Sequence, residues 1–135
     1  MAKPSASARP DPVFIDNPAI AGRAQNFTTV TVDLVPVLAS WRESLFAHEW
    51  LNQNGTLKNP GEQRDSVRDQ RLAIAGKIQS RTPLERPVLG IGIMDNIEIG
   101  SGRDTLLTLA AEGLHEISVH IPRSHLDEFR PFIKD

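Results

Sequence analysis

The sequence contains no cysteine in its 135 residues. Catalysis by a thiol, disulfide crosslinks and zinc sites with cysteine ligands are therefore excluded. The sequence also lacks any run of about 18 consecutive apolar residues, so no membrane-spanning helix is expected. Residues 1–12 lack the apolar centre of a secretory signal, and we expect a cytoplasmic protein.

The sequence also has almost no excess of charge of either sign, and it has few aromatic side chains. Lys and Arg total 15 against 17 for Asp and Glu, which gives a net charge of −2, whereas domains that coat nucleic acid usually carry a strong basic excess. Five Phe, two Trp and no Tyr leave few rings for stacking on bases. These counts do not exclude a local basic patch on the surface. Hydrophobic residues make up 39% of the chain, which is enough for the core of one domain.

Proline marks the first part of the chain. Four of the ten prolines fall within residues 1–26, and each interrupts regular backbone hydrogen bonding. We therefore predict a flexible or irregular N-terminal arm over 1–26, in which residues 13–15 dock on the body of a domain over 27–135. From Phe27 the alternation of threonine and valine predicts a strand.

A helix is predicted to follow this strand. Asp33 is the expected N-cap, Pro36 falls in the first turn, and the helix is expected to run to about Asn54. Trp41 and Trp50 are nine residues apart, so they would lie on opposite faces of that helix. We expect one indole in the core and the other as an anchor for a partner.

The second helix has a clearer start. Asn59 is the predicted N-cap, and Glu62 completes a capping box for a helix running from Pro60 to about Gln79. This helix also bears three arginines within an arc of about 60°. They are Arg64, Arg68 and Arg71. They form a candidate phosphate rail for DNA, and the alternative is a solvated face in which acidic neighbours pair with them.

The remaining elements complete the fold class. We predict a hairpin over 88–99 with a two-residue turn at Asp95-Asn96, a helix over 105–112, a strand over 116–121 and a helix over 124–132. Strands and helices thus occur in mixed order, which indicates an α+β (mixed α/β) domain. The four histidines show no metal-binding spacing, and we expect structural or surface roles for them.

The junction from Gly100 to Thr105 is the strongest functional signal, because a strand passes there through a glycine loop into a helix. Backbone N–H groups and the positive end of the helix dipole would converge on one point, which suits a phosphate. Gly100 and Gly102 would let the backbone approach the ligand, Arg103 would add a forked contact, and Ser101 and Thr105 would donate from hydroxyls. The loop is neither a Walker loop nor a dinucleotide fingerprint, and the alternative is a tight turn before a capped helix.

Residues 86–121 show a hairpin that ends in a G-x-x-R motif opening a helix, followed by a strand. The motif here is Gly100-Ser101-Gly102-Arg103, and the strand region reads Gly-Leu-His-Glu-Ile-Ser-Val-His-Ile over 113–121. This succession resembles the ParB/sulfiredoxin-like superfamily, whose opening strand is similar to residues 29–34. The resemblance spans roughly 27–122 and implies a small domain with a short mixed sheet and helices packed around it.

The resemblance implies a site for ATP or CTP at Gly100, Ser101, Gly102 and Arg103, with Thr105 beside it, and with Mg²⁺ as a further cofactor. Ser101 stands where sulfiredoxins carry their catalytic cysteine, so sulfinic-acid reduction is excluded. Nuclease-like relatives read D-G-H-H-R at this point, and this chain lacks both the aspartate and the second histidine. Candidate catalytic residues are therefore Arg103, Glu98 and Asp104, of which the two acids could hold magnesium. No dedicated metal site is predicted.

Compact ParB-like proteins of plasmids are the branch that best fits the length, since 135 residues leave no room for the DNA-reading region of partition ParB proteins. This branch includes fertility inhibitors of the Osa type, which block DNA transfer by a conjugative secretion system. The resemblance thus implies a mobile-element accessory protein with ATPase or DNase activity. Its expected partners are a nucleotide, DNA and a secretion or conjugation protein. The alternative is a non-catalytic interaction module that keeps the fold and inhibits a partner.

Overall fold

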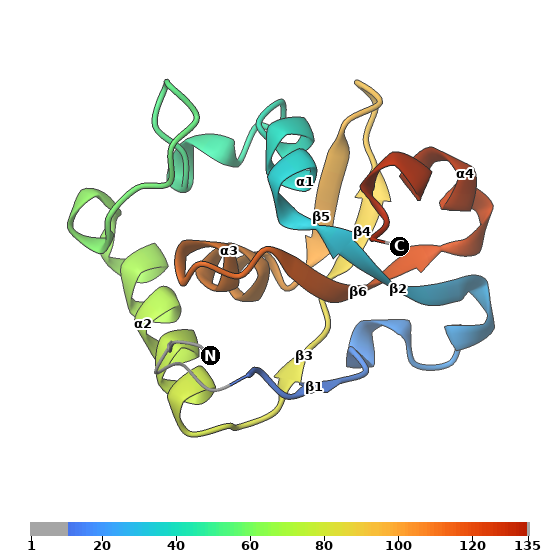
Figure 1. Ribbon diagram of the computed structural model, residues 1–135, viewed down its shortest axis with the longest axis horizontal. Helices are drawn as coiled ribbons and strands as arrows, with labels where there is room; N and C mark the ends of the chain where they lie inside the picture. Colours follow the sequence, from blue (N-terminus) through green and yellow to red (C-terminus); the bar gives the residue numbers. More distant parts are fainter. Residues whose placement is uncertain (1–10, 135) are drawn as a thin grey trace, which may run out of the picture.

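A four-stranded mixed sheet forms the centre of the molecule, which we describe from a computed structural model over residues 11–134 (Figure 1). The strands lie in the order β2-β6-β4-β5. Their bounds are β2 Phe27–Asp33, β6 Glu116–Pro122, β4 Val88–Ile91 and β5 Ile97–Ser101. The pairs β2–β6 and β4–β5 are antiparallel, whereas β4 and β6 run parallel. The predicted α+β class is confirmed.

The longest strand pair, β2 with β6, shows which side chains of the sheet face the core. β2 and β6 pair over seven residues, from Phe27 opposite Pro122 to Asp33 opposite Glu116. Successive side chains of a strand point to opposite faces. The side chains of Ile117, Val119 and Ile121 are therefore all buried in the core, as the alternation predicts.

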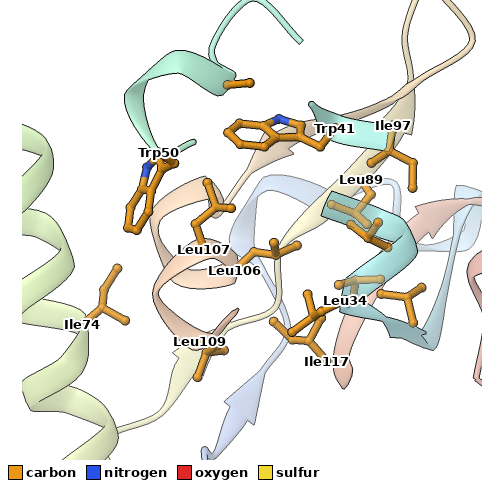
Figure 2. Close-up of a cluster of buried hydrophobic side chains, with 14 of the residues drawn as sticks. Leu34, Trp41, Trp50, Ile74, Leu89, Ile97, Leu106, Leu107, Leu109 and Ile117 are labelled. Atoms are coloured by element: carbon orange, nitrogen blue, oxygen red, sulfur yellow. The ribbon is translucent and has the colours of Figure 1, made fainter. Parts of the chain in front are cut away.

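The first helix is shorter than expected. α1 spans Leu34–Trp41, and turns follow it, with a short 3₁₀ helix η3 at Ala47–Glu49. The prediction of a helix to Asn54 is wrong, because a continuous helix would send two indoles to opposite faces. The break instead lets both Trp41 and Trp50 enter the core, where they are 1% and 0% exposed, on either side of α3 residues Leu106 and Leu107 (Figure 2). Trp50 is therefore no surface anchor.

The second helix also starts later than predicted. The Asn59 N–H donates to the Glu62 carboxylate over 2.8 Å, but this capping box closes only a 3₁₀ turn, η4 at Pro60–Glu62. Gln63 is extended, so α2 spans Asp65–Gln79. Its inward side chains are buried as expected, and α2 packs against α3 (Figure 1). They are Val67, Ile74 and Ile78.

The β4–β5 hairpin is confirmed, but its turn differs from the prediction. The Gly92 N–H donates to the Asn96 carbonyl over 2.7 Å, so the loop has three residues, 93–95, and not two. Asp95 supplies the positive φ of 60° that such a loop needs. Asn96 therefore lies beyond the loop, and its side chain is buried and donates to the Glu98 carboxylate over 3.0 Å.

The C-terminal half completes the core. α3 spans Arg103–Ala111 and so begins two residues before the predicted Thr105, and Gly113 follows it at φ 95° as predicted. The helix expected over 124–132 is instead divided into η5 Arg123–His125, α4 Leu126–Phe129 and η6 Arg130–Phe132. Pro131 within this stretch removes one backbone donor and favours the division.

The N-terminal arm, residues 11–26, runs past β3 to the start of β2, along the bottom of the view in Figure 1, whereas α1 and α4 lie at the top. Its strand β1, Phe14–Ile15, pairs in parallel with β3, Leu84–Glu85, so the predicted docking of residues 13–15 is confirmed. The 3₁₀ helices η1 Pro18–Ile20 and η2 Ala24–Asn26 follow. Residues 1–10 of the predicted arm lie outside the described residues. None of the helices in residues 11–134 has the length and apolar character needed to cross a bilayer.

Candidate functional site

A cavity of about 330 Å³ opens at the start of α3, between that helix, α2 and the β1–β3 pair. It is lined by residues from four parts of the chain, which are Ile15, then Gln70, Ile74 and Lys77, then Pro83, Leu84 and Glu85, and finally Gly102, Arg103, Asp104 and Thr105. Four consecutive residues of the predicted glycine loop and helix start therefore face a common space. We call this space the α3 cavity.

Gly102 sets the geometry of the loop. It has a φ of +82°, and a Cβ added there would lie 2.9 Å from the Pro87 Cα, so only glycine fits both the conformation and the space. The first helical hydrogen bond runs from the Leu106 N–H to the Gly102 carbonyl over 3.0 Å. The N–H groups before Leu106 have no partner within the helix, which leaves the first turn of α3 suited to an anion.

Charges of both signs line the α3 cavity. Lys77, an exposed residue of α2, and Arg103 bring positive charge, whereas Glu85 and Asp104 bring negative charge. The Arg103 guanidinium lies 4.4 Å from the centroid of the Phe46 ring, in a cation–π contact. Phe46 does not line the α3 cavity, so this contact directs the guanidinium toward a residue outside the cavity.

Asp104 is the acid of the α3 cavity whose pKa is shifted. Burial raises the pKa of its carboxyl above the ordinary value, and the Arg103 guanidinium offsets part of that rise. A carboxyl in such surroundings holds a proton to higher pH than a solvated one. Among the predicted catalytic residues, Arg103 and Asp104 share the cavity.

The other predicted residues lie elsewhere. Glu98 does not line the α3 cavity, and its carboxylate accepts from Asn96 near the hairpin loop. The Ser101 hydroxyl accepts from the Asn17 amide over 3.1 Å, so it faces the N-terminal arm. Gly100 is exposed. The structure thus brings Gly102, Arg103, Asp104 and Thr105 together but leaves Gly100, Ser101 and Glu98 outside.

The arginines of α2 are engaged within the protein. Arg64 pairs with Glu49 and holds the pKa of that carboxyl below its ordinary value. Arg68 pairs with two acidic neighbours on its own helix, Asp65 and Asp69. These contacts match the solvated face that was the alternative to a phosphate rail.

Arg71 contacts both the loop before α2 and the buried core. Its guanidinium donates to the Lys58 carbonyl over 2.7 Å and to the Gln63 side chain over 3.0 Å. It also lies 5.3 Å from the centroid of the Trp50 ring. Arg71 therefore ties the loop before α2 to the helix.

Metal ligands are sparse in the described part of the chain. Within residues 11–134, no group of three or more His, Asp or Glu side chains could hold a metal ion. Mg²⁺ commonly needs only one or two carboxylates when substrate phosphates complete its coordination. Asp104 and Glu85, both at the α3 cavity, could supply such carboxylates.

A larger hollow of about 680 Å³ lies on the other side of β1. Its lining residues are Asp11, Pro12 and Phe14 of the arm, Thr31 of β2, residues 113–118 and Lys134. Its polar side chains are exposed or half-buried, and none of its lining residues belongs to the first turn of a helix. The chemistry therefore favours the smaller α3 cavity as the binding site.

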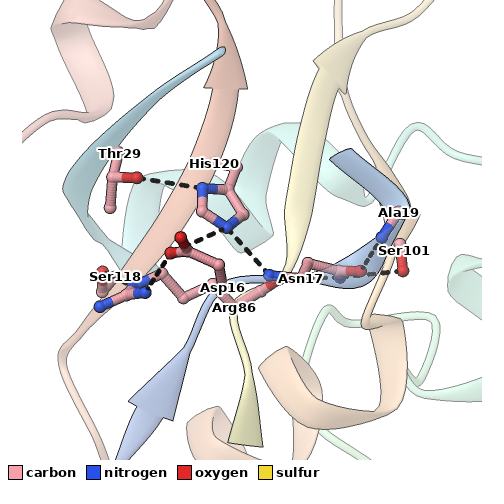
Figure 3. Close-up of polar contacts among 8 residues, drawn as sticks. All are labelled: Asp16, Asn17, Ala19, Thr29, Arg86, Ser101, Ser118 and His120. Carbon is pink, nitrogen blue, oxygen red and sulfur yellow. Dashed lines mark hydrogen bonds and ion pairs between the residues drawn. The ribbon is translucent and has the colours of Figure 1, made fainter. Parts of the chain in front are cut away.

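A buried histidine network was not predicted from the sequence (Figure 3). The His120 side chain is 2% exposed. Its Nδ1 lies 3.0 Å from the Thr29 hydroxyl, and its Nε2 accepts from the Asn17 backbone N–H over 3.2 Å. Asp16 lies beside the ring and pairs with Arg86 over 2.7 Å.

Asn17 connects this network to the glycine loop. Its side-chain amide donates to the Arg86 carbonyl over 2.9 Å and to the Ser101 hydroxyl over 3.1 Å. Its side-chain oxygen caps η1 by accepting from the Ala19 N–H. The Asn17-Pro18 dipeptide is a typical turn start, and that was the only local signal for this residue.

Comparisons of the chain with protein-family models, with curated proteins and with solved structures found no match. The resemblance to the ParB/sulfiredoxin-like superfamily therefore depends on the sequence motifs alone and stays a prediction.

Proposed function

We propose that the protein binds a phosphate-bearing small molecule, a nucleotide, in the α3 cavity. The observation that supports this most directly is the convergence of the first turn of α3 with Lys77 on one space. Free N–H groups at a helix start attract anions, and an ammonium group adds a point charge for phosphate. The volume of about 330 Å³ is at the low end for small-molecule sites, which favours a mononucleotide over a dinucleotide.

The chain's own residues have distinct roles in this proposal. Gly102 keeps the backbone close to the ligand, Lys77 balances phosphate charge, and Thr105 offers a hydroxyl. Arg103 contributes the start of α3, while its guanidinium lies on the Phe46 ring. Mg²⁺ bound with the nucleotide would neutralise further phosphate charge, and Asp104 and Glu85 would hold it through carboxylate oxygens. ATP or CTP as the ligand, ATPase or DNase activity and inhibition of conjugative transfer stay predictions from the resemblance.

Calorimetric titration tests the proposal. ATP and CTP are each titrated, with and without Mg²⁺, into the full chain, into Lys77→Gln and into Lys58→Gln. Lys58 lies before α2 and lines none of the cavities described above. We expect binding of at least one nucleotide, a loss of roughly tenfold in affinity in Lys77→Gln, as for one charged hydrogen bond, and no change in Lys58→Gln. Absence of heat with both nucleotides, or an equal loss in both variants, contradicts the proposal.

A further inference from the structure

We propose that His120 is a pH-sensitive latch: the neutral ring fastens the arm segment 16–20 to the sheet, and protonation of the ring releases that segment. This latch belongs to the N-terminal arm and is independent of nucleotide binding.

The Asn17 backbone N–H can only donate, so the His120 Nε2 atom that lies 3.2 Å away must accept. An accepting Nε2 carries no proton. The proton of the neutral ring is then on Nδ1, which donates to the Thr29 hydroxyl over 3.0 Å. The network therefore selects one tautomer of a neutral imidazole.

Protonation reverses the role of Nε2. The imidazolium has a donor at each nitrogen, so two N–H groups would face each other at the Asn17 contact. That hydrogen bond is lost, and a charge is created on a side chain that is only 2% exposed. Burying a charge without a close partner costs far more than burying the neutral ring.

Two charged groups face the ring and act in opposite directions. The Asp16 Oδ1 atom is 3.8 Å from Nε2 and favours the imidazolium, whereas Arg86, which already pairs with Asp16 over 2.7 Å, disfavours it. Burial is the largest influence, and together these effects lower the pKa of His120 below its ordinary value. The ring is therefore neutral at pH 7 in the docked state.

Within residues 11–134, the other elements packed around the ring contribute no titrating group that acts on it. β2 contributes the Thr29 hydroxyl, and β6 contributes Ser118, whose hydroxyl accepts from Arg86 over 2.9 Å. In β4, Val88 is the partner of His120 in the parallel ladder. Among the groups at this contact, His120 is thus the one that takes up a proton on release as the pH falls through the ordinary histidine range.

Segment 16–20, which the bond from the Asn17 N–H to His120 fastens, makes few other contacts with the body. Within residues 16–20, the Asp16 pair with Arg86 lies at an exposed carboxylate, and Ile20 is the one apolar side chain that is buried. Asn17 makes the remaining bonds to the body, to the Arg86 carbonyl and the Ser101 hydroxyl. Loss of the bond to His120 therefore weakens a large share of the docking.

Amide hydrogen exchange on the full chain measures the latch directly. Protection factors, corrected for the intrinsic pH dependence of exchange, are followed at the Asn17 amide between pH 7.5 and pH 5. The Leu34 amide, which donates to the His115 carbonyl at the far end of β2 and β6, is the internal control. We expect the protection of Asn17 to fall by up to about 30-fold at pH 5, the limit for a released histidine with an ordinary pKa near 6.5, while Leu34 changes little.

Two variants separate the latch from general loosening. His120→Gln keeps an acceptor for the Asn17 N–H but does not titrate, so the pH dependence at Asn17 should disappear. Asp16→Asn removes the carboxylate that favours the imidazolium in the docked state, and with it the ion pair to Arg86, so the segment should be released at higher pH and the protection of Asn17 should fall at least as far. This second variant tests the latch even if His120→Gln folds poorly.

Nitrogen chemical shifts of the His120 ring provide a second readout. We expect a neutral ring protonated at Nδ1 at pH 7.5. A ring protonated at Nε2 at pH 7.5 overturns the inference. Unchanged protection of Asn17 down to pH 5, or an equal fall in His120→Gln, also overturns it.

Discussion

Replacement of Gly102 by alanine is the sharpest test of the loop geometry. Gly102 has a φ of +82°, a conformation that costs an L-residue about 1–2 kcal/mol. The added Cβ would also lie 2.9 Å from the Cα and 3.2 Å from the Cβ of Pro87. Pro87 is buried, and its carbonyl accepts from the His120 N–H over 2.9 Å, so it cannot move aside freely.

The two costs add because they have different origins. Overpacking against a fixed backbone typically costs about 1–3 kcal/mol. We therefore expect Gly102→Ala to lower the free energy of unfolding by about 2–5 kcal/mol. That is a large part of the roughly 5–15 kcal/mol that stabilises a typical domain.

Urea unfolding followed by tryptophan fluorescence measures this change, since both indoles are buried in the native state. Gly76→Ala is the matched control. Gly76 lies within α2, and an added Cβ there meets nothing within 4 Å, so alanine should stabilise the helix by about 0.5–1 kcal/mol. If Gly102→Ala is as stable as the unmodified chain, or ranks with Gly76→Ala, the proposed loop geometry is wrong.

Two further predictions concern the arginines of α2 and the acid of the α3 cavity. Arg71→Met should lower the free energy of unfolding by about 2 kcal/mol, because two hydrogen bonds and a ring contact are lost. Arg68→Met should cost less than about 1 kcal/mol, because its partners are exposed carboxylates; equal losses in urea unfolding would contradict this difference. Asp104→Asn should stabilise the protein at pH 7. Burial raises the pKa of Asp104 in the folded state, so its ionised form opposes folding above that pKa, and the opposition disappears as the pH falls below the ordinary aspartate value. The gain measured by urea unfolding should therefore shrink toward pH 3, whereas parallel pH profiles would show that Asp104 is not perturbed.

The strands were predictable because their signal is local. In β6 the alternation of apolar residues, two apart, is enough to assign both the strand and its buried face. The helix ends were less predictable, because tertiary packing decides them. The end of α1 depends on the need to bury both Trp41 and Trp50, and that need is visible only once the core around α3 is known.

The same distinction applies to the candidate site. Gly102 to Thr105 are adjacent in sequence, so the glycine loop could be recognised before the fold was known. Lys77 enters the α3 cavity only because α2 packs on α3. Asn17 meets Ser101 across 84 residues and His120 across 103 residues, and no local pattern encodes such a pairing.

The loop at the end of β5 therefore contacts the N-terminal arm on one side and the α3 cavity on the other. Ser101 is bound to the N-terminal arm through Asn17, whereas the next residue, Gly102, begins the wall of the α3 cavity. Ile15, two residues before Asn17, lines the same cavity. The wall of the proposed nucleotide site at Ile15 thus adjoins the segment 16–20 that His120 fastens. That segment is continuous with one side of the cavity through β1 and is bonded to the glycine loop on the other through Asn17 and Ser101.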